Sequence, residues 1–413
     1  MDAKQIMKFL EDTAYVHVGG TEQEKQVAAY ISDCCKSLGL HTTTEDFDVP
    51  MATVHNAKLY AGGEEIPCMA YRCSGNADVE APLFYLNTRG DAYALSQCKG
   101  KIVLLETGVG YWTYHDLVES GAVGFITFNG DVRVADSDID DRELRTYVAR
   151  DLKILPGVNI HARSAVKMIA DGVQSARIVL AQDQYTGTSQ NVILDLPGDI
   201  DKTIVFTAHY DSTPLSKGTY DNMSGSAALL SLTKYYKDHP HRHGVRFIWC
   251  GSEERGLLGS KAYVAAHAEE LKDVVLNVNI DMIGSIMGGF RAISTAEEGL
   301  PYFIRYLSLM HGVCIESRQD IYSSDSTPFA DAGVPAISFA RIAPSNTATA
   351  HNRYDTPAVM SGPQMVYDID FIRLFADQMI NAVICPVKRE IPDKMKEKLD
   401  TYLSRKRSKP FTF

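Results

Sequence analysis

Histidine and acidic residues gather in one stretch, Thr207–Gly225, with a spacing that could serve metal chemistry. His209 and Asp211 follow the apolar run 204–206, and Asp221 comes after a glycine-containing loop. Residues two apart in an extended chain point to the same side, so the His209 imidazole could bind a metal while Asp211 orients it. A polar turn after a buried strand is the plainer interpretation, and this stretch alone does not decide between the two.

Further motifs along the chain add residues of the same chemical types. They contain Glu253 and Glu254, then Asp281, then Asp325, and finally His351 with Asp355. Each alone fits a solvated turn or a helix cap. Ligands collect at the carboxyl ends of strands in open α/β sheets, however, so the joint pattern predicts one shared pocket. Two histidines with three carboxylates suit a pair of zinc-like ions, and an adjacent carboxylate could act as the base in metal-assisted hydrolysis.

Apolar runs that alternate with helical patterns predict the elements that position these motifs. Strands are expected at 191–194, 203–207, 245–250, 274–280 and 334–339, and helices at 225–236, 259–271, 301–311 and 363–383. This alternation predicts a doubly wound α/β sheet. Near the start, Thr21 and Glu24 resemble a capping box at the beginning of another helix.

A change of texture between residues 46 and 185 indicates an inserted domain. Segments there are short, rich in β-forming residues and bounded by turns, as at 100–105 and 121–129. We therefore expect a discontinuous catalytic domain, 1–45 with 186–413, and an insert at 46–185. The segments Gly-Lys-Ile-Val-Leu-Leu and Gly-Ala-Val-Gly-Phe-Ile-Thr-Phe-Asn resemble a protease-associated domain, although any small β-rich insert remains an alternative.

Composition narrows the function classes. A chain of 413 residues exceeds the usual size of one hydrophobic core, and its net charge of -11 argues against a general nucleic-acid binder. No apolar run approaches the roughly 20 residues that span a membrane, so no membrane partner is expected. The first residues contain no apolar signal core, which predicts a cytoplasmic protein. The eight cysteines form no Cys-x-x-Cys pair, and the oligomeric state stays open.

Taken in order, the motifs resemble those of the di-zinc aminopeptidases, a family that includes glutamate carboxypeptidase-like peptidases. They read His-x-Asp, Asp-Asn-x-Ser-Gly, Glu-Glu-x-Gly-Leu-x-Gly-Ser, Asp-Met-x-Gly and a late histidine. The resemblance implies a three-layer α/β zinc-exopeptidase fold with a mixed sheet and an inserted protease-associated domain. It implies these roles: His209 and Asp281 on one zinc, Glu254 and His351 on the other, Asp221 bridging both, Glu253 as general base, and Asp211 orienting His209. In this family the Asp221–Asn222 peptide bond is often cis.

The function implied by the resemblance is an exopeptidase that releases N-terminal residues from peptides. Tyr322 is a candidate to stabilise the oxyanion, and Asp325 and Asp355 are candidates for supporting or substrate-binding roles. Ser326 departs from the family, which often has histidine there. A carboxypeptidase or a glutaminyl cyclase of the same fold, and a non-catalytic binding scaffold, are the alternatives.

The surplus of acids in the motifs favours a free N-terminus as the group recognised. A carboxypeptidase would instead cluster arginines around a terminal carboxylate, for which Arg255, Arg341 and Arg353 are the candidates.

Overall fold

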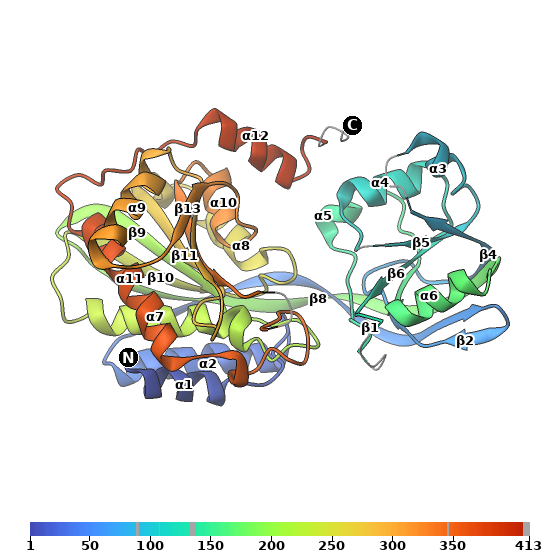
Figure 1. Ribbon diagram of the computed structural model, residues 1–413, viewed down its shortest axis with the longest axis horizontal. Helices are drawn as coiled ribbons and strands as arrows, with labels where there is room; N and C mark the ends of the chain where they lie inside the picture. The colour runs from blue at the N-terminus through green and yellow to red at the C-terminus, as the bar shows by residue number, and fades with distance from the viewer. Residues whose placement is uncertain (88–90, 107, 133–137, 345–346, 408–413) are drawn as a thin grey trace. The chain divides into compact units, whose positions relative to one another are not determined.

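A computed structural model describes residues 1–87, 91–106, 108–132, 138–344 and 347–407 of the chain (Figure 1). The chain forms two compact units. The first combines Met1–Val49 with Thr188–Leu403, and the second combines Pro50–Gly187 with the chain from Ser404 onward. The long strands β1 (Thr43–Ala61) and β8 (Ser175–Leu196) each begin in one unit and end in the other.

A mixed sheet is the centre of the first unit. Its strand order is β13-β12-β14-β11-β9-β10-β8, in which β10, β9, β11 and β14 are mutually parallel. β12 runs antiparallel to β14, and β8 antiparallel to β10. Besides β8, these strands are β9 (Ile200–His209), β10 (His243–Cys250), β11 (Val274–Ile280), β12 (Gly289–Ser294), β13 (Glu316–Gln319) and β14 (Ala336–Ile342).

Helices cover both faces of this sheet. They are α1 (Ala3–Asp12), α2 (Glu22–Ser37), α7 (Ser224–Tyr236), α8 (Leu258–Ala266), α9 (Gly299–His311), α10 (Ser326–Asp331), α11 (Gly362–Ile380) and α12 (Asp393–Tyr402). Side chains alternate across a strand, so Ile204 and Phe206 of β9 enter one buried cluster with α1, α2, α7 and α11. Val205 enters a second cluster with Tyr263 of α8 and Phe329 of α10. The result is the predicted three-layer α/β fold.

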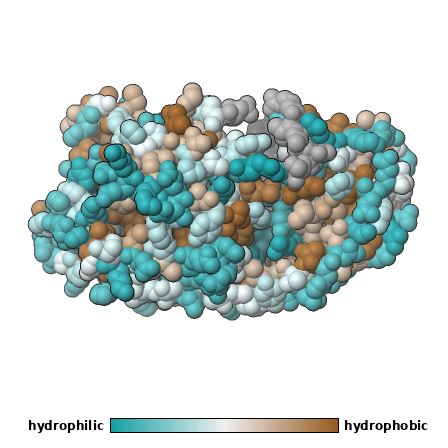
Figure 2. Space-filling view, turned by 90° about the horizontal axis from the view of Figure 1, so that it is seen from below, coloured by the Kyte–Doolittle hydropathy of each residue, from teal (hydrophilic) through white to brown (hydrophobic). Residues whose placement is uncertain are grey.

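The outward surface of the first unit is polar where α1 and α2 lie. Ile6, Phe9 and Leu10 of α1 are buried, whereas Lys4 and other charged residues of the helix are exposed. The view from below shows this part of the molecule largely covered by hydrophilic side chains (Figure 2). Within the described residues, no helix is both long enough and apolar enough to cross a bilayer.

The second unit has a smaller sheet of its own. The strands β4, β5, β6 and β7 pair in parallel, β3 is antiparallel to β7, and the first part of β8 is antiparallel to β4. Besides β1, its strands are β2 (Glu64–Ile66), β3 (Cys68–Ala70), β4 (Ala77–Leu86), β5 (Ile102–Leu105), β6 (Gly124–Asn129) and β7 (Gly157–His161), and its helices are α3 (Ala92–Ser96), α4 (Tyr111–Glu119), α5 (Thr146–Ala149) and α6 (Ala162–Ala170). The insert, which was predicted to be rich in β-strands, therefore also contains helices.

Candidate metal centre

The candidate site lies where the central strands of the first unit end. His209 is the last residue of β9, the glutamate pair follows the end of β10, and Asp281 directly follows β11. In the sheet, β9 lies between β10 and β11, so the chain leaves β9 to one side and later returns on the other. Such a reversal of strand order opens a crevice at the carboxyl ends of the strands, where ligands bind in α/β proteins.

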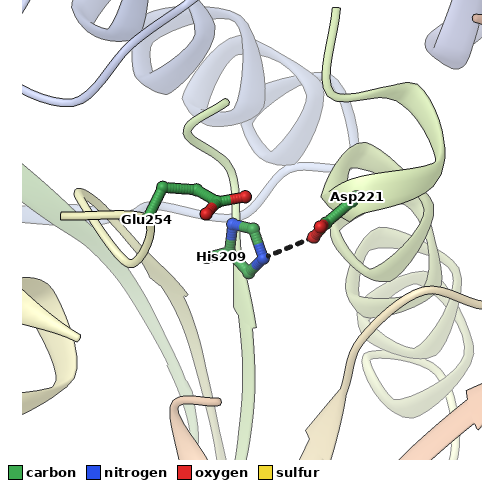
Figure 3. Close-up of side chains that lie close together, drawn as sticks. All are labelled: His209, Asp221 and Glu254. Atoms are coloured by element: carbon green, nitrogen blue, oxygen red, sulfur yellow. Dashed lines mark hydrogen bonds and ion pairs between the residues drawn. The ribbon is translucent and has the colours of Figure 1, made fainter. Parts of the chain in front are cut away.

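Asp221 lies between two histidines that are far apart in sequence. Its Oδ1 is 3.1 Å from Nε2 of His209, and its Oδ2 is 3.0 Å from Nε2 of His351. Figure 3 shows His209 at the end of its strand, with Asp221 reaching it from the segment before α7 and Glu254 from the loop after β10. The Asp221–Asn222 peptide bond is cis, as the resemblance led us to expect. One carboxylate thus offers a separate oxygen to each imidazole.

The other predicted ligands complete two groups around this carboxylate. Asp281 Oδ1 is 3.7 Å from Nε2 of His209, and Glu254 Oε1 is 3.0 Å from Nε2 of His351. The side chain of His209 is only 1% exposed, whereas that of His351 is 55% exposed. The structure therefore brings all five predicted ligands together as a buried group and a more open group that share Asp221.

The two imidazoles are surrounded by negative charge. Burial lowers the pKa of His209, but Glu253 and hydrogen-bonding carboxylates, including that of Asp221, raise it well above its usual value. Burial also lowers the pKa of His351, yet Glu254 and Asp221 raise it to about 12. Burial raises the pKa of Asp221, and its hydrogen bonds to the two histidines outweigh that effect and lower it. The cluster favours positive charge at both imidazoles.

This donor set fits divalent metal ions. Each Nε2 faces carboxylate oxygens, and Oδ1 of Asp281 is buried without a hydrogen-bond partner among the described residues. An imidazole nitrogen and carboxylate oxygens converging on one point are the ligands zinc takes in proteins. His209, Asp221 and Glu254 each place a ligand atom within 4.8 Å of those of the other two. Cations bound here would offset the surplus of carboxylate charge.

Asp211 contacts both the histidine and the glutamate pair. Its Oδ1 is 3.4 Å from Nδ1 of His209, and its backbone oxygen is 3.2 Å from the same nitrogen. The carboxylate also accepts hydrogen bonds from the backbone N–H groups of Glu253, at 2.8 Å, and Glu254, at 3.1 Å. Asp211 therefore contacts both the imidazole, which it was predicted to orient, and the turn that carries the two glutamates.

Glu253 lies in strongly negative surroundings. Burial, together with Glu254, Asp325 and Asp281, raises the pKa of its carboxyl well above the usual value, and His209 opposes this shift. A raised pKa is typical of carboxylates that accept and return protons.

Glu24 is a member of this region that the sequence did not indicate. The side chain of Thr21 accepts a hydrogen bond from the N–H of Glu24, as in a capping box, but the Glu24 carboxylate does not close the box on Thr21. It accepts instead from the N–H of Gly20 and from the N–H of Ser252, beside the glutamate pair. Burial, followed by the charge of Asp211, raises the pKa of Glu24 to about 8. Its complete burial, in a helix whose neighbouring positions are exposed, is what sequence periodicity could not reveal.

Asp355 contacts the segment that carries Asp221. Its carboxylate accepts from the N–H of Tyr220 at 2.6 Å, the N–H of Asp221 at 3.2 Å and the hydroxyl of Ser216 at 3.0 Å. Burial and the charge of Asp221 raise its pKa to about 7, which the hydrogen bonds to the backbone oppose. Asp355, for which a supporting role near His351 was predicted, thus binds the backbone of the segment that carries Asp221.

The hydroxyl of Tyr322 and the side chain of Asp325, the two remaining candidates, are also buried near the ligands. The Tyr322 hydroxyl has no hydrogen-bond partner in the described chain, and burial followed by the charges of Asp281 and Asp221 raises its pKa. Burial raises the pKa of Asp325 to about 7, with the charge of Asp281 adding to this effect and that of His209 opposing it. Tyr322 thus retains a hydroxyl donor near the ligands.

One of the three arginines considered as a carboxylate anchor, Arg341, already has a carboxylate partner. The guanidinium of Arg341 donates to both carboxylate oxygens of Asp368 in α11, one of them at 2.8 Å, and to the backbone oxygen of Gly288. Both members of this ion pair are buried. Arg341 therefore stabilises the fold through this ion pair.

The fold and the carboxylate-histidine cluster together define an α/β peptidase built around a metal centre. More particularly, the family model of peptidase family M28 matches residues 191–366 of the chain. The matched region begins in β8 and ends in α11, so it includes every predicted ligand.

Individual relatives agree with this assignment. The chain is 28% identical over 352 residues to aminopeptidase YwaD of Bacillus subtilis, covering 78% of this chain and 71% of the relative. It is 28% identical over 291 residues to leucine aminopeptidase 2 of Arthroderma otae, covering 67% of this chain but only 57% of that relative's length.

Two solved structures share the fold over nearly the whole chain. A zinc aminopeptidase from Bacillus subtilis, BSAP, aligns with a TM-score of 0.77 at 23% identity, covering 94% of this chain and 97% of the other. An aminopeptidase from Aneurinibacillus sp. strain AM-1 aligns with a TM-score of 0.75 at 24% identity, covering 94% and 96%. The α/β fold class is thereby confirmed, while the identification of the insert as a protease-associated domain stays a prediction.

Proposed function

We propose that the chain is a zinc-dependent aminopeptidase whose site holds two ions. The observation that carries the proposal is Asp221, which presents one oxygen to His209 and the other to His351. His209 and Asp281 would hold one ion, Glu254 and His351 the other, and Asp221 would bridge them. The names of the relatives, which include a zinc aminopeptidase and leucine aminopeptidases, support the same activity.

The chemistry follows from the surrounding side chains. Zinc bound here would polarise the scissile carbonyl and lower the pKa of a bound water. Glu253 would take the proton from the attacking water and deliver it to the leaving amine. The hydroxyl of Tyr322, for which the described part of the chain supplies no hydrogen-bond partner, would donate to the oxygen that gains negative charge. Asp211 would keep both His209 and the glutamate turn in place for these steps.

The charges at the site favour recognition of a free N-terminus. A terminal ammonium is attracted by the carboxylates that surround the ligands, whereas a terminal carboxylate would need a positive anchor. Of the arginines considered for that anchor, Arg341 is committed to Asp368. We therefore place the aminopeptidase ahead of the carboxypeptidase.

One pair of peptides tests the proposal. A peptide with a free N-terminus and its N-acetylated twin are incubated with the zinc-loaded protein, and the products are followed by mass spectrometry. We expect stepwise loss of N-terminal residues from the free peptide only. Stepwise loss from the carboxyl end of the acetylated twin would refute the proposal. Elemental analysis of the dialysed protein should find two equivalents of zinc, and one equivalent would contradict the paired site.

We further propose that the inserted region, 46–185, is a protease-associated domain. Its parallel strands β4 to β7 support this, as does its place in the sequence between the two segments of the peptidase domain.

A further inference from the structure

The turn after β10, residues Gly251–Glu254, is held from behind by two buried carboxylates. We call it the glutamate turn. The N–H of Ser252 donates to Oε1 of Glu24 at 2.9 Å, and the next two N–H groups, of Glu253 and Glu254, donate to the two oxygens of Asp211. Three successive backbone donors are therefore bound by two acids that come from different parts of the chain.

Glu24 is enclosed completely. It is 0% exposed, and besides Ser252 N–H its carboxylate accepts from the hydroxyl of Ser189 at 2.8 Å and from the N–H of Gly20 at 2.6 Å. The hydroxyl of Ser252 adds a contact at 3.3 Å. A buried carboxylate surrounded by four donors fixes the positions of all of them, because moving any one leaves a polar group unpaired.

The conformation of the glutamate turn requires such support. Ser252 has φ of 53°, in the left-handed region that costs a non-glycine residue about 1–2 kcal/mol. The turn also lies tight against α2 and the segment before it. A Cβ at Gly251 would be 2.9 Å from Oε1 of Glu24, and one at Gly19 would be 2.9 Å from Cα of Ser252. The turn thus has little room to shift while Glu24 is in place.

We propose that Glu24 is a positioning residue for the peptidase reaction, acting through Ser252 to set where the glutamate turn presents Glu253. Asp211 fixes the same turn from the side of His209, so the two acids act on adjacent peptide groups. The expected effect on kcat rests on the proposed function. The expected effect on the backbone of the glutamate turn does not depend on it.

Two substitutions distinguish the loss of the Glu24 charge from the loss of its hydrogen bonds. Glu24→Gln keeps one acceptor oxygen but places an amide nitrogen where one oxygen now accepts a hydrogen bond. Glu24→Ala removes every acceptor. A displacement of about 1 Å at a reacting group can cost roughly 100-fold in rate. We therefore expect kcat to fall roughly 100-fold in Glu24→Ala and less in Glu24→Gln, with KM and the zinc content unchanged.

Two control variants on the same helix isolate this effect. Val27→Ala removes buried apolar contacts of α2 and should lower the melting temperature, while kcat per zinc-loaded molecule stays at the wild-type value. Glu22→Gln changes an exposed acid in the first turn of α2 and should alter neither quantity appreciably. If Val27→Ala lowers kcat as much as Glu24→Gln does, Glu24 merely stabilises the helix and the proposal is wrong.

Hydrogen exchange gives a readout that does not depend on activity. In zinc-loaded protein, amide exchange in the peptide that spans the glutamate turn should accelerate in Glu24→Gln and Glu24→Ala and remain slow in Val27→Ala. Unchanged exchange in both Glu24 variants would overturn the inference, even if kcat fell. If the wild-type protein released no N-terminal residue, the proposed function would fail, and the exchange rates would still decide whether Glu24 holds the turn. If Glu24→Ala does not fold, Glu24→Gln alone serves for both measurements.

Discussion

Replacing Asp355 by alanine tests whether the metal centre depends on the support behind Asp221. The Asp355 carboxylate accepts hydrogen bonds from the N–H groups of Tyr220 and Asp221 and from the hydroxyl of Ser216. Asp355→Ala removes the two oxygens that accept these three hydrogen bonds, in a fully buried position. We expect weaker zinc binding and lower stability together, because the unsupported segment is the one that carries the proposed bridging ligand.

The magnitude follows from the groups left unpaired. Each buried N–H without a partner costs about 1–3 kcal/mol, and the Ser216 hydroxyl can rotate to another acceptor, so only the two N–H groups count fully. The expected loss of stability is therefore about 2–6 kcal/mol, toward the lower end if water enters the space left by the carboxylate. Groups that support metal ligands typically contribute 10- to 100-fold in metal affinity, and we expect a loss of this size.

The assay is a zinc titration against a competing chelator, combined with thermal unfolding with and without zinc. Asp355→Asn is the conservative variant, since it retains an acceptor for Tyr220 and should lose less. Asp377→Ala is the control: it removes an acid of α11 that binds Tyr236 and Arg373 away from the site, and it should lower stability without weakening zinc. Wild-type zinc affinity in Asp355→Ala, with a stability loss like that of Asp377→Ala, would refute the reasoning.

Three further predictions follow from the site and its surroundings. Glu253→Gln should retain both zinc equivalents and lose roughly 10²–10⁴-fold in kcat, and loss of one equivalent would mean that the two glutamates exchange roles. Asp221→Ala should lose more zinc on dialysis than His351→Ala, because one carboxylate serves both ions, and equal retention would contradict the bridge. Asp368→Ala should destabilise the protein by about 3–5 kcal/mol in urea unfolding, because it leaves the Arg341 charge buried and unpaired. A loss below about 1 kcal/mol would show that Arg341 finds another partner.

The fold class could be predicted because strand ends leave a local signature. The segments that lead to His209 and Asp281 are mostly apolar and buried, as is typical of central parallel strands. The helix expected at 225–236 corresponds to α7, Ser224–Tyr236. The order of the motifs along the chain then predicts that they meet at one edge of the sheet. It gives neither the distances between the side chains nor their hydrogen-bond partners.

The supporting contacts could not be predicted because they join segments distant in sequence. Glu24 lies near the start of an amphipathic helix, three residues before buried Val27. This spacing is compatible with a helix-capping residue and equally with a buried residue that accepts a hydrogen bond from Ser252. Asp355 comes four residues after His351 in a loop, where the spacing in sequence does not indicate which way a side chain points. The sequence could not exclude Arg341 of β14 from substrate binding, because its partner Asp368 lies in a different element, the helix α11. Such pairings require the tertiary structure.

The spread of the site along the sequence also determines when it can exist during synthesis. Glu24 is translated early, Asp221 near the middle, and His351 and Asp355 only after β14 has been made. At about 5–20 residues per second, a ribosome needs roughly ten seconds to proceed from Asp221 to His351. Throughout that interval the nascent chain lacks one proposed zinc ligand and the acid behind another. With the proposed ligand roles, the metal centre is complete only when most of its own domain has been translated.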